Sequence, residues 1–125
     1  MLVLIIDDTA DTRDLYLHYL AAHGIEVMSA VDGPSGLDAA RLSHPDVIVL
    51  DMSLPRLDGW EVARRLKADV ATRDIGLIAV TGHATGEARQ RALDAGIDEY
   101  LVKPCAPEDV LAAITNWRPT ARPQG

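Results

Sequence analysis

The sequence contains a single cysteine among 125 residues, and no apolar run approaches the length of a membrane-spanning segment. One cysteine excludes an internal disulfide and is typical of a protein from a reducing compartment. A spanning helix needs about 20 consecutive apolar residues. The apolar stretch at the amino terminus is too short for a secretory signal and has no basic segment before it. We therefore expect a cytoplasmic protein without a membrane segment.

Basic residues are also scarce, with 12 Lys and Arg against 19 Asp and Glu and a formal net charge of -7 at pH 7. Nucleic acids and anionic membranes both attract basic surfaces, so we expect direct binding to neither. Aromatic residues make up 4% of the chain and form no stripe with basic ones. The remaining composition is ordinary for a globular domain with its own apolar core.

Apolar runs alternate with helical patterns along the chain. The expected strands are Leu2–Ile6, Ile25–Ala30, Val47–Leu50, Leu77–Val80 and Tyr100–Val102. The expected helices are Asp11–His23, Gly33–His44, Asp58–Ala68, Ala84–Ala95 and Pro107–Trp117. This alternation with short connections predicts an α/β domain with a doubly wound parallel sheet covered by helices on both faces. We assign residues 1–118 to this single domain and residues 119–125 to a frayed tail.

The first expected helix, Asp11–His23, carries apolar side chains that we assign to one face. We expect Leu15, Tyr19, Leu20 and His23 to share the face that meets the core.

Polar residues follow four of the five expected strands. Asp7 and Asp8 end the first strand, Asp51 the third, Thr81 the fourth and Lys103 the fifth. In doubly wound parallel sheets, ligands bind outside the carboxyl ends of the strands. We therefore expect these side chains to share one crevice.

Three carboxylates in one crevice repel each other, by about 4 kcal/mol for a pair about 4 Å apart at an effective dielectric near 20. A hard divalent cation offsets this repulsion, and an all-oxygen ligand set favours Mg²⁺ over zinc. The Lys103 ammonium and the Thr81 hydroxyl suit phosphoryl oxygens, while a carboxylate between them suits attack on phosphorus. Asp51 is the best nucleophile candidate, because it ends the middle strand and enters the loop "MSLPRLDG".

Each of these residues also has an ordinary structural interpretation. Asp7 and Asp8 suit the cap of the first helix, and Asp51 suits a turn at the end of a strand. Thr81 suits a strand or the cap of the fourth helix, and Lys103 suits a solvated surface. The combination favours the Mg²⁺ site, because all five residues are expected at the same edge of the sheet.

Five motifs together, "LIIDD", "VIVLDMSLPRLDGWE", "IAVTGHA", "AGIDEYLVKP" and "PEDVLAAI", resemble the receiver domain of two-component response regulators over nearly the whole chain. The resemblance implies a flavodoxin-like (βα)5 fold with strand order 2-1-3-4-5. It implies that a histidine kinase or a histidine phosphotransfer protein donates a phosphoryl group to an aspartate with the help of Mg²⁺. An unidentified downstream protein then reads the change. We expect a signalling module of the stand-alone, single-domain type rather than an enzyme.

The resemblance also implies a role for each acidic residue of the crevice. Asp51 is the expected phosphoacceptor, and Asp8 is the expected direct ligand of Mg²⁺. Asp7 is expected to act on the metal indirectly, through water or hydrogen bonds. Asp51 and the backbone carbonyl of Ser53 complete the expected coordination by the protein.

The same resemblance implies a switch. Lys103 is expected to pair with the phosphoryl group, and the Thr81 hydroxyl to move toward it. Tyr100 occupies the position of the switch aromatic and is expected to rotate inward together with Thr81; its alternative is a half-buried packing role. The surface of the fourth helix, fifth strand and fifth helix would change with them.

Three further expectations follow from the resemblance. The bond between Lys103 and Pro104 is expected to be cis. Ser53 and His83 are expected to tune the lifetime of the phosphoryl group. Cys105 stands where a large aromatic residue is frequent, so we expect looser packing under the lysine loop.

A Mg²⁺-dependent phosphatase with an aspartate nucleophile, of the haloacid dehalogenase type, is the main alternative function. That class expects Asp-x-Asp on the first strand and a cap domain, whereas here the candidate nucleophile follows the third strand. A flavin carrier would need a Ser/Thr/Gly-rich loop after the first strand, and the sequence has none. A scaffold that only resembles a receiver is disfavoured, because every chemical position is filled.

Overall fold

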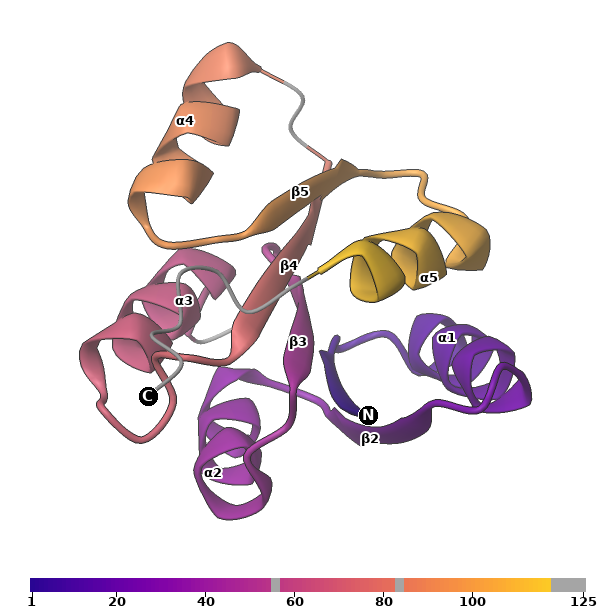
Figure 1. Cartoon of the computed structure of the whole chain (residues 1–125). Coiled ribbons are helices and arrows are strands. Elements are labelled where there is room, and N and C mark those ends of the chain that lie inside the picture. The colour runs from indigo at the N-terminus through magenta and orange to yellow at the C-terminus, as the bar shows by residue number, and fades with distance from the viewer. Residues whose placement is uncertain (55–56, 83–84, 118–125) are drawn as a thin grey trace.

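The computed structural model describes residues 1–54, 57–82 and 85–117, and within them five parallel strands form one sheet with helices on both faces (Figure 1). The strands are β1 (Leu2–Ile6), β2 (Glu26–Ala30), β3 (Val47–Asp51), β4 (Gly76–Thr81) and β5 (Glu99–Val102). The helices are α1 (Ala10–Ala22), α2 (Gly33–Ser43), α3 (Gly59–Ala68), α4 (Gly86–Asp94) and α5 (Pro107–Asn116). The strand order is β2-β1-β3-β4-β5. The predicted fold class and strand order are confirmed.

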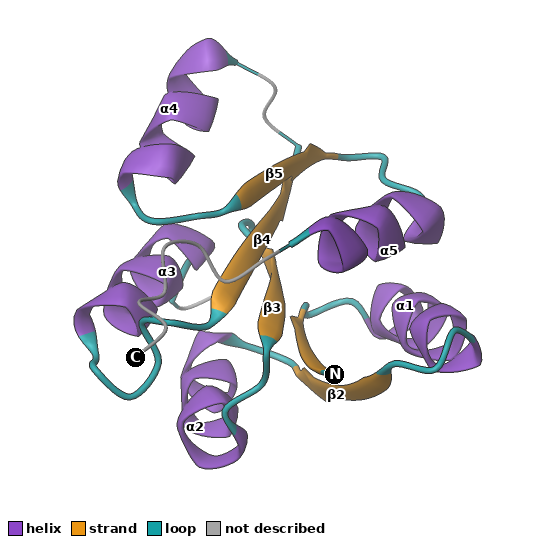
Figure 2. Cartoon of the chain, viewed as in Figure 1, coloured by secondary structure: helices purple, strands orange, loops and turns teal. Residues whose placement is uncertain are grey.

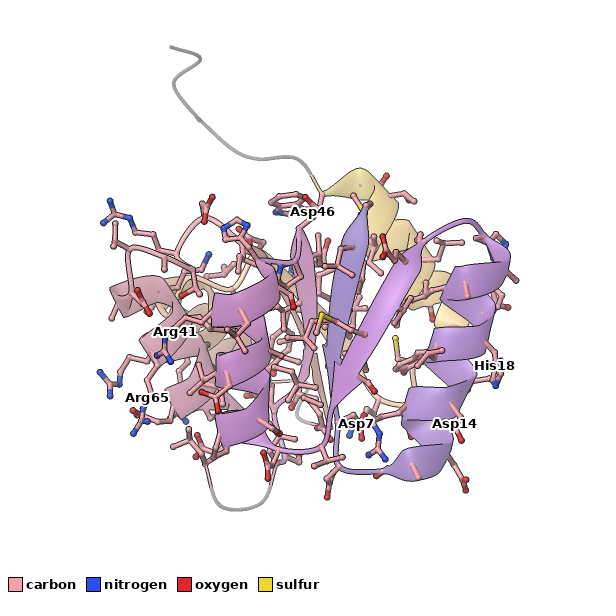
Figure 3. All side chains as sticks on the ribbon, turned by 90° about the horizontal axis from the view of Figure 1, so that it is seen from below. Asp7, Asp14, His18, Arg41, Asp46 and Arg65 are labelled. Carbon is pink, nitrogen blue, oxygen red and sulfur yellow. The ribbon has the colours of Figure 1, made fainter. Side chains whose placement is uncertain are left out.

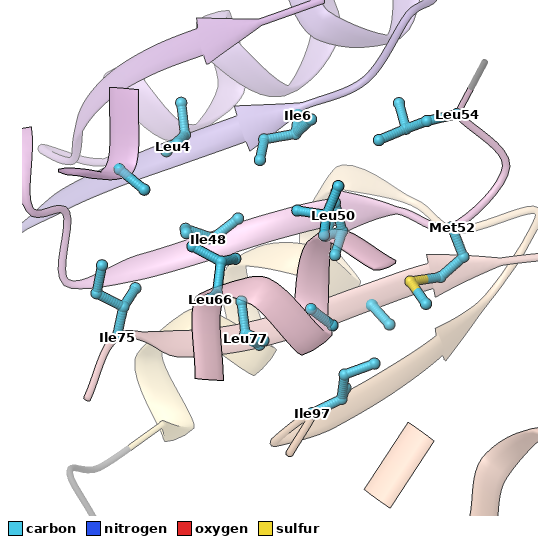
Figure 4. Close-up of a cluster of buried hydrophobic side chains, with 14 of the residues drawn as sticks. Leu4, Ile6, Ile48, Leu50, Met52, Leu54, Leu66, Ile75, Leu77 and Ile97 are labelled. Atoms are coloured by element: carbon cyan, nitrogen blue, oxygen red, sulfur yellow. The ribbon is translucent and has the colours of Figure 1, made fainter. Parts of the chain in front are cut away.

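The helices divide between the two faces of the sheet. Figure 2 shows α1 and α5 on one face and α2, α3 and α4 on the other. Strand residues alternate between the faces, as the pleat of a strand requires. On β3, for example, Val47 and Val49 join the cluster under α1 and α5, while Ile48 and Leu50 join the cluster on the other face (Figure 4). The three central strands are buried on both faces, which explains their nearly continuous apolar sequences.

The packing of α1 differs from the sequence-based expectation. Tyr16 and Leu20 are the buried residues of this helix, whereas Leu15 is 52% exposed. Because α1 carries apolar side chains at positions 15, 16, 17, 19 and 20, its pattern does not select one face. The sheet selects Tyr16 and Leu20, four residues apart. The placement of Leu15 and His23 on the core face was wrong, because both are exposed.

Close backbone contact fixes the start of α3 against the end of β3. A Cβ atom on Gly59 would lie 2.6 Å from Met52 Cα and 3.0 Å from the carbonyl oxygen of Asp51. Only glycine fits at this approach without movement of the backbone. Asp58 caps the helix, because its Oδ1 accepts a hydrogen bond from the Glu61 amide at 3.0 Å.

Some sequence-based expectations fall outside the described residues. These are the tail, residues 119–125, and the start of the fourth helix at residue 84. No helix in the described ranges combines the length and the apolar character needed to cross a membrane.

Candidate functional site

The ends of β1 and β3 bring three carboxylates together. The two strands are neighbours in the sheet, with Ile6 opposite Leu50, so Asp7 and Asp51 leave the sheet side by side. One carboxylate oxygen each from Asp7, Asp8 and Asp51 lies within 4.8 Å of the other two. Figure 3 shows Asp7 at the edge of the sheet opposite the edge that carries Asp46.

The environments of the three carboxylates differ. Asp7 and Asp51 are 5% and 4% exposed, whereas Asp8 is exposed to solvent. Burial raises the pKa of Asp7; the hydrogen bond from the Thr9 amide lowers it, and the charge of Asp51 raises it. A buried carboxylate with a raised pKa beside two others is a site that a cation would stabilise.

The structure also tests whether Asp7 and Asp8, the adjacent acidic residues after β1, cap helix α1. Asp7 Oδ1 accepts a hydrogen bond from the Thr9 backbone amide at 2.8 Å, just before α1. The Thr9 side chain makes no cap hydrogen bond with the helix. Asp7 therefore supports the start of α1 and contributes to the acidic cluster as well, since a carboxylate has two oxygens.

The donors around Asp51 converge on one of its oxygens. Lys103 Nζ lies 3.1 Å from Asp51 Oδ1, and the Ser53 amide donates to the same oxygen at 2.9 Å. The side chain of Lys103 is 40% exposed, so the ammonium reaches the buried carboxylate from the solvent side. The role of the Ser53 carbonyl as a metal ligand stays a prediction.

Thr81 and Lys103 end neighbouring strands beside Asp51. The Lys103 amide donates to the Thr81 carbonyl at 2.7 Å, and the Thr81 residue is 1% exposed. The peptide bond between Lys103 and Pro104 is cis. All five residues that the sequence placed at strand ends therefore lie at the same edge of the sheet.

Tyr100 lies on β5, opposite Ala79 of β4, and is 6% exposed. It belongs to the apolar cluster on the face of α2, α3 and α4. It is more deeply buried than the half-buried alternative assumed, and its action as a switch stays a prediction. His83, the second position expected to tune the phosphoryl lifetime, lies outside the described residues.

Sequence reasoning missed two side chains near the site. Arg13 Nη1 donates to the backbone carbonyl of Asp7 at 2.8 Å, and the Tyr16 hydroxyl donates to the Cys105 carbonyl at 3.2 Å. A cation in the first turn of the helix after the acidic doublet was the available signal for Arg13. Nothing in the sequence pairs Tyr16 with a residue 89 positions away. Tyr16 packs in the same apolar cluster as Cys105. Its ring therefore lies under the loop that carries Lys103, the place where we expected looser packing.

The oxygen atoms gathered here fit a hard divalent cation. The three carboxylates form the group of potential metal ligands found among the described residues, and it contains neither His nor Cys. Such a set suits Mg²⁺ better than zinc. Beside it, a buried carboxylate and an ammonium 3.1 Å apart suit the binding and transfer of a phosphoryl group.

Comparisons with known proteins agree with this geometry. The family model of the response regulator receiver domain matches residues 3–115. The DNA-binding dual master transcriptional regulator RpaA of Synechocystis sp. is 38% identical over 112 residues, which cover 90% of this chain and 46% of RpaA. The chain spans about half the length of the curated relatives it matches.

Solved structures give the same result. The chemotaxis response regulator CheY4 of Vibrio cholerae superposes with a TM-score of 0.86 at 29% identity, covering 91% of this chain and 95% of CheY4. The receiver domain of the sensor histidine kinase PA1611 of Pseudomonas aeruginosa, described with a magnesium ion in its active-site cleft, gives a TM-score of 0.83 at 28% identity over 93% of this chain and 95% of that domain. The chain belongs to the receiver domain family of two-component response regulators.

Proposed function

We propose that this chain accepts a phosphoryl group on Asp51 from a histidine kinase or a histidine phosphotransfer protein. The observation that carries the proposal is the setting of Asp51. Its carboxylate is 4% exposed, is grouped with two other carboxylates, and has the Lys103 ammonium 3.1 Å away. A surface turn residue would not need such partners.

Mg²⁺ would be held directly by Asp8 and Asp51 and by the backbone carbonyl of Ser53, with Asp7 acting indirectly. The close approach of the carboxylate oxygens and their all-oxygen chemistry support this assignment. When bound, Mg²⁺ supplies positive charge that neutralises the carboxylates and the phosphoryl oxygens. The magnesium ion described in the PA1611 receiver domain supports the same choice of metal.

The hydrogen bonds of Asp51 orient it for attack. Ser53 and Lys103 both donate to Oδ1, so Oδ2 would form the new bond to phosphorus. The bond from phosphorus to the imidazole nitrogen of the donor breaks, and its electron pair leaves with the imidazole. Lys103 then pairs with the phosphoryl oxygens, where its charge stabilises the transferred group.

The signal would pass outward from Thr81. Its hydroxyl would move to the phosphoryl group, and Tyr100, which is already 6% exposed within the apolar cluster, would be held in that inward position by the change. The two changes shift the population of conformations of α4, β5 and α5, and a downstream protein reads that surface. The position of Thr81 on the strand next to β3 supports this route.

Phosphorylation from a small donor tests the proposal. The protein is incubated with acetyl phosphate and Mg²⁺, and intact-mass spectrometry should find one acid-labile phosphoryl group. Asp51→Asn should abolish the adduct, whereas Asp14→Asn, at an exposed position on α1 (Figure 3), should not. An unmodified wild-type protein, or an undiminished adduct in Asp51→Asn, would refute the proposal.

A further inference from the structure

The loop that carries Lys103 is held at both of its ends. At its start, the Lys103 amide donates to the Thr81 carbonyl of β4 at 2.7 Å. At its end, the Ala106 amide donates to Asp109 Oδ2 of α5 at 3.1 Å. These contacts leave the middle of the loop, at Cys105, to be fixed by something else.

Tyr16 of α1 reaches that middle position. Its hydroxyl donates to the Cys105 carbonyl at 3.2 Å, and the residue is 5% exposed. Burial raises the pKa of Tyr16 to about 12, so the phenol keeps its proton and remains a donor at neutral pH. The negative charges of Asp7 and Asp51 contribute to this raised pKa.

The reach of Lys103 depends on its backbone. A lysine side chain has a flexible four-carbon stem and loses considerable conformational entropy when its ammonium is held in one place. This side chain is 40% exposed, so packing does not fully enclose it. The position of its main chain therefore decides how often the ammonium meets Asp51. Displacement of a catalytic group by about 1 Å can already slow a reaction substantially.

We infer that Tyr16 is a positioning residue for Lys103. By holding the Cys105 carbonyl, two residues after Lys103, it ties the lysine loop to α1 and keeps the ammonium 3.1 Å from Asp51. The inference rests on the proposed function for its effect on phosphorylation, but the placement of Lys103 can be measured independently.

Tyr19 provides a matched control on the same helix. It is half-buried, and its ring centroid lies 4.5 Å from that of His23, near the other end of α1 from the site. Tyr16→Phe and Tyr19→Phe each remove one hydroxyl and leave the ring in place. The two variants therefore differ in whether they cut the bond to the loop.

The first test compares phosphorylation rates. With acetyl phosphate and saturating Mg²⁺, Tyr16→Phe should react about two- to tenfold more slowly than wild type, the factor that corresponds to one neutral hydrogen bond. Tyr19→Phe should react at the wild-type rate. In a Lys103→Met background, Tyr16→Phe should cause no further slowing, because the group it positions is gone. A wild-type rate for Tyr16→Phe, or equal slowing in both backgrounds, would overturn the inference.

The second test needs no phosphoryl transfer. The NMR signal of the Lys103 ε-methylene, assigned with Lys103→Met, should shift in Tyr16→Phe and stay in place in Tyr19→Phe. An unchanged signal in Tyr16→Phe would overturn the inference whatever the rates are. If the wild-type protein accepts no phosphoryl group, the proposed function fails, and this signal still decides the role of Tyr16.

Discussion

Replacement of Asp7 by Asn should stabilise the protein when no divalent cation is present. Asp7 is 5% exposed, and burial together with the charges of Asp51 and Asp8 raises its pKa. Asn has nearly the same shape and retains an oxygen for the Thr9 amide, which Asp7 now binds at 2.8 Å. The substitution therefore removes mainly the buried charge.

The expected size of this effect follows from the carboxylate spacing. Two unit charges 4.8 Å apart interact by about 3.5 kcal/mol at an effective dielectric of 20. The ammonium of Lys103 cancels part of the repulsion, and solvent screens the exposed Asp8. We expect the free energy of unfolding at about pH 7 in EDTA to rise by about 1–2 kcal/mol. For a chain of this size, the midpoint of thermal unfolding should rise by roughly 4–8 °C.

The gain should depend on pH and on the metal. Because folding raises the pKa of Asp7, the stability linked to its proton is present below the unfolded value, about 3.9, and is lost as pH rises through the folded pKa. The free energies of unfolding of wild type and Asp7→Asn should therefore become equal near pH 3.5, where about half or more of Asp7 is protonated even in the unfolded chain. With saturating Mg²⁺, wild type should instead be more stable than Asp7→Asn, because the cation binds the cluster of three carboxylates only in the folded state.

Urea unfolding monitored by tryptophan fluorescence gives the free energy of unfolding in EDTA at about pH 7, in EDTA at about pH 3.5, and in saturating Mg²⁺. Asp14→Asn, at an exposed position on α1, serves as the control and should leave each value unchanged. Equal or lower stability of Asp7→Asn at about pH 7 in EDTA, or a gain that persists in acid, would refute the electrostatic reasoning.

Two further predictions concern Tyr16 and Gly59. In an alkaline absorbance titration, a tyrosine that ionises at about 12 should be present in wild type and absent from Tyr16→Phe. Because folding raises the pKa of this phenol above its ordinary value of 10.0, the free energy of unfolding of wild type should fall as pH rises from 10.0 toward about 12. If Tyr16→Phe keeps the late step, the assignment is wrong. Gly59→Ala should lower the free energy of unfolding by about 1–3 kcal/mol, because the new Cβ meets the backbone of Met52 at 2.6 Å. Gly86→Ala, whose new Cβ would meet no described atom within 4 Å, should be neutral or slightly stabilising, and an equal loss at both sites would contradict the clash.

The strand ends were predictable because the sequence changes there from apolar to polar or charged residues. The run Leu2–Ile6 is apolar since β1 is buried on both faces, and the sequence turns acidic at the residue where the sheet ends. The same change marks Asp51, the last residue of β3, and Lys103, the residue after β5. In a parallel sheet, all such points lie at one edge. The convergence of the carboxylates could therefore be predicted without side-chain detail.

Contacts between distant helices and loops could not be predicted in this way. Tyr16 and Leu15 are adjacent and both apolar in character, and only the packing of α1 on the sheet decides which of them is buried. The bond from Tyr16 to Cys105 joins residues 89 positions apart, through a backbone carbonyl that every residue type possesses. A backbone acceptor leaves no sequence signal. The contact of Arg13 with the Asp7 carbonyl also uses a backbone acceptor, so the sequence signals the cation in the first turn of α1 but not the partner of that cation.

The most direct measurement locates the phosphoryl group on the chain. The protein is treated with acetyl phosphate and Mg²⁺ and then with borohydride, which reduces an acyl phosphate of aspartate to homoserine, and the peptides are mapped by mass spectrometry. We expect homoserine at position 51, with Asp7 and Asp8 unmodified and no homoserine when EDTA replaces Mg²⁺. Homoserine at position 7 or 8, or none anywhere in the magnesium-treated protein, would contradict the assignment of Asp51 as the phosphoacceptor.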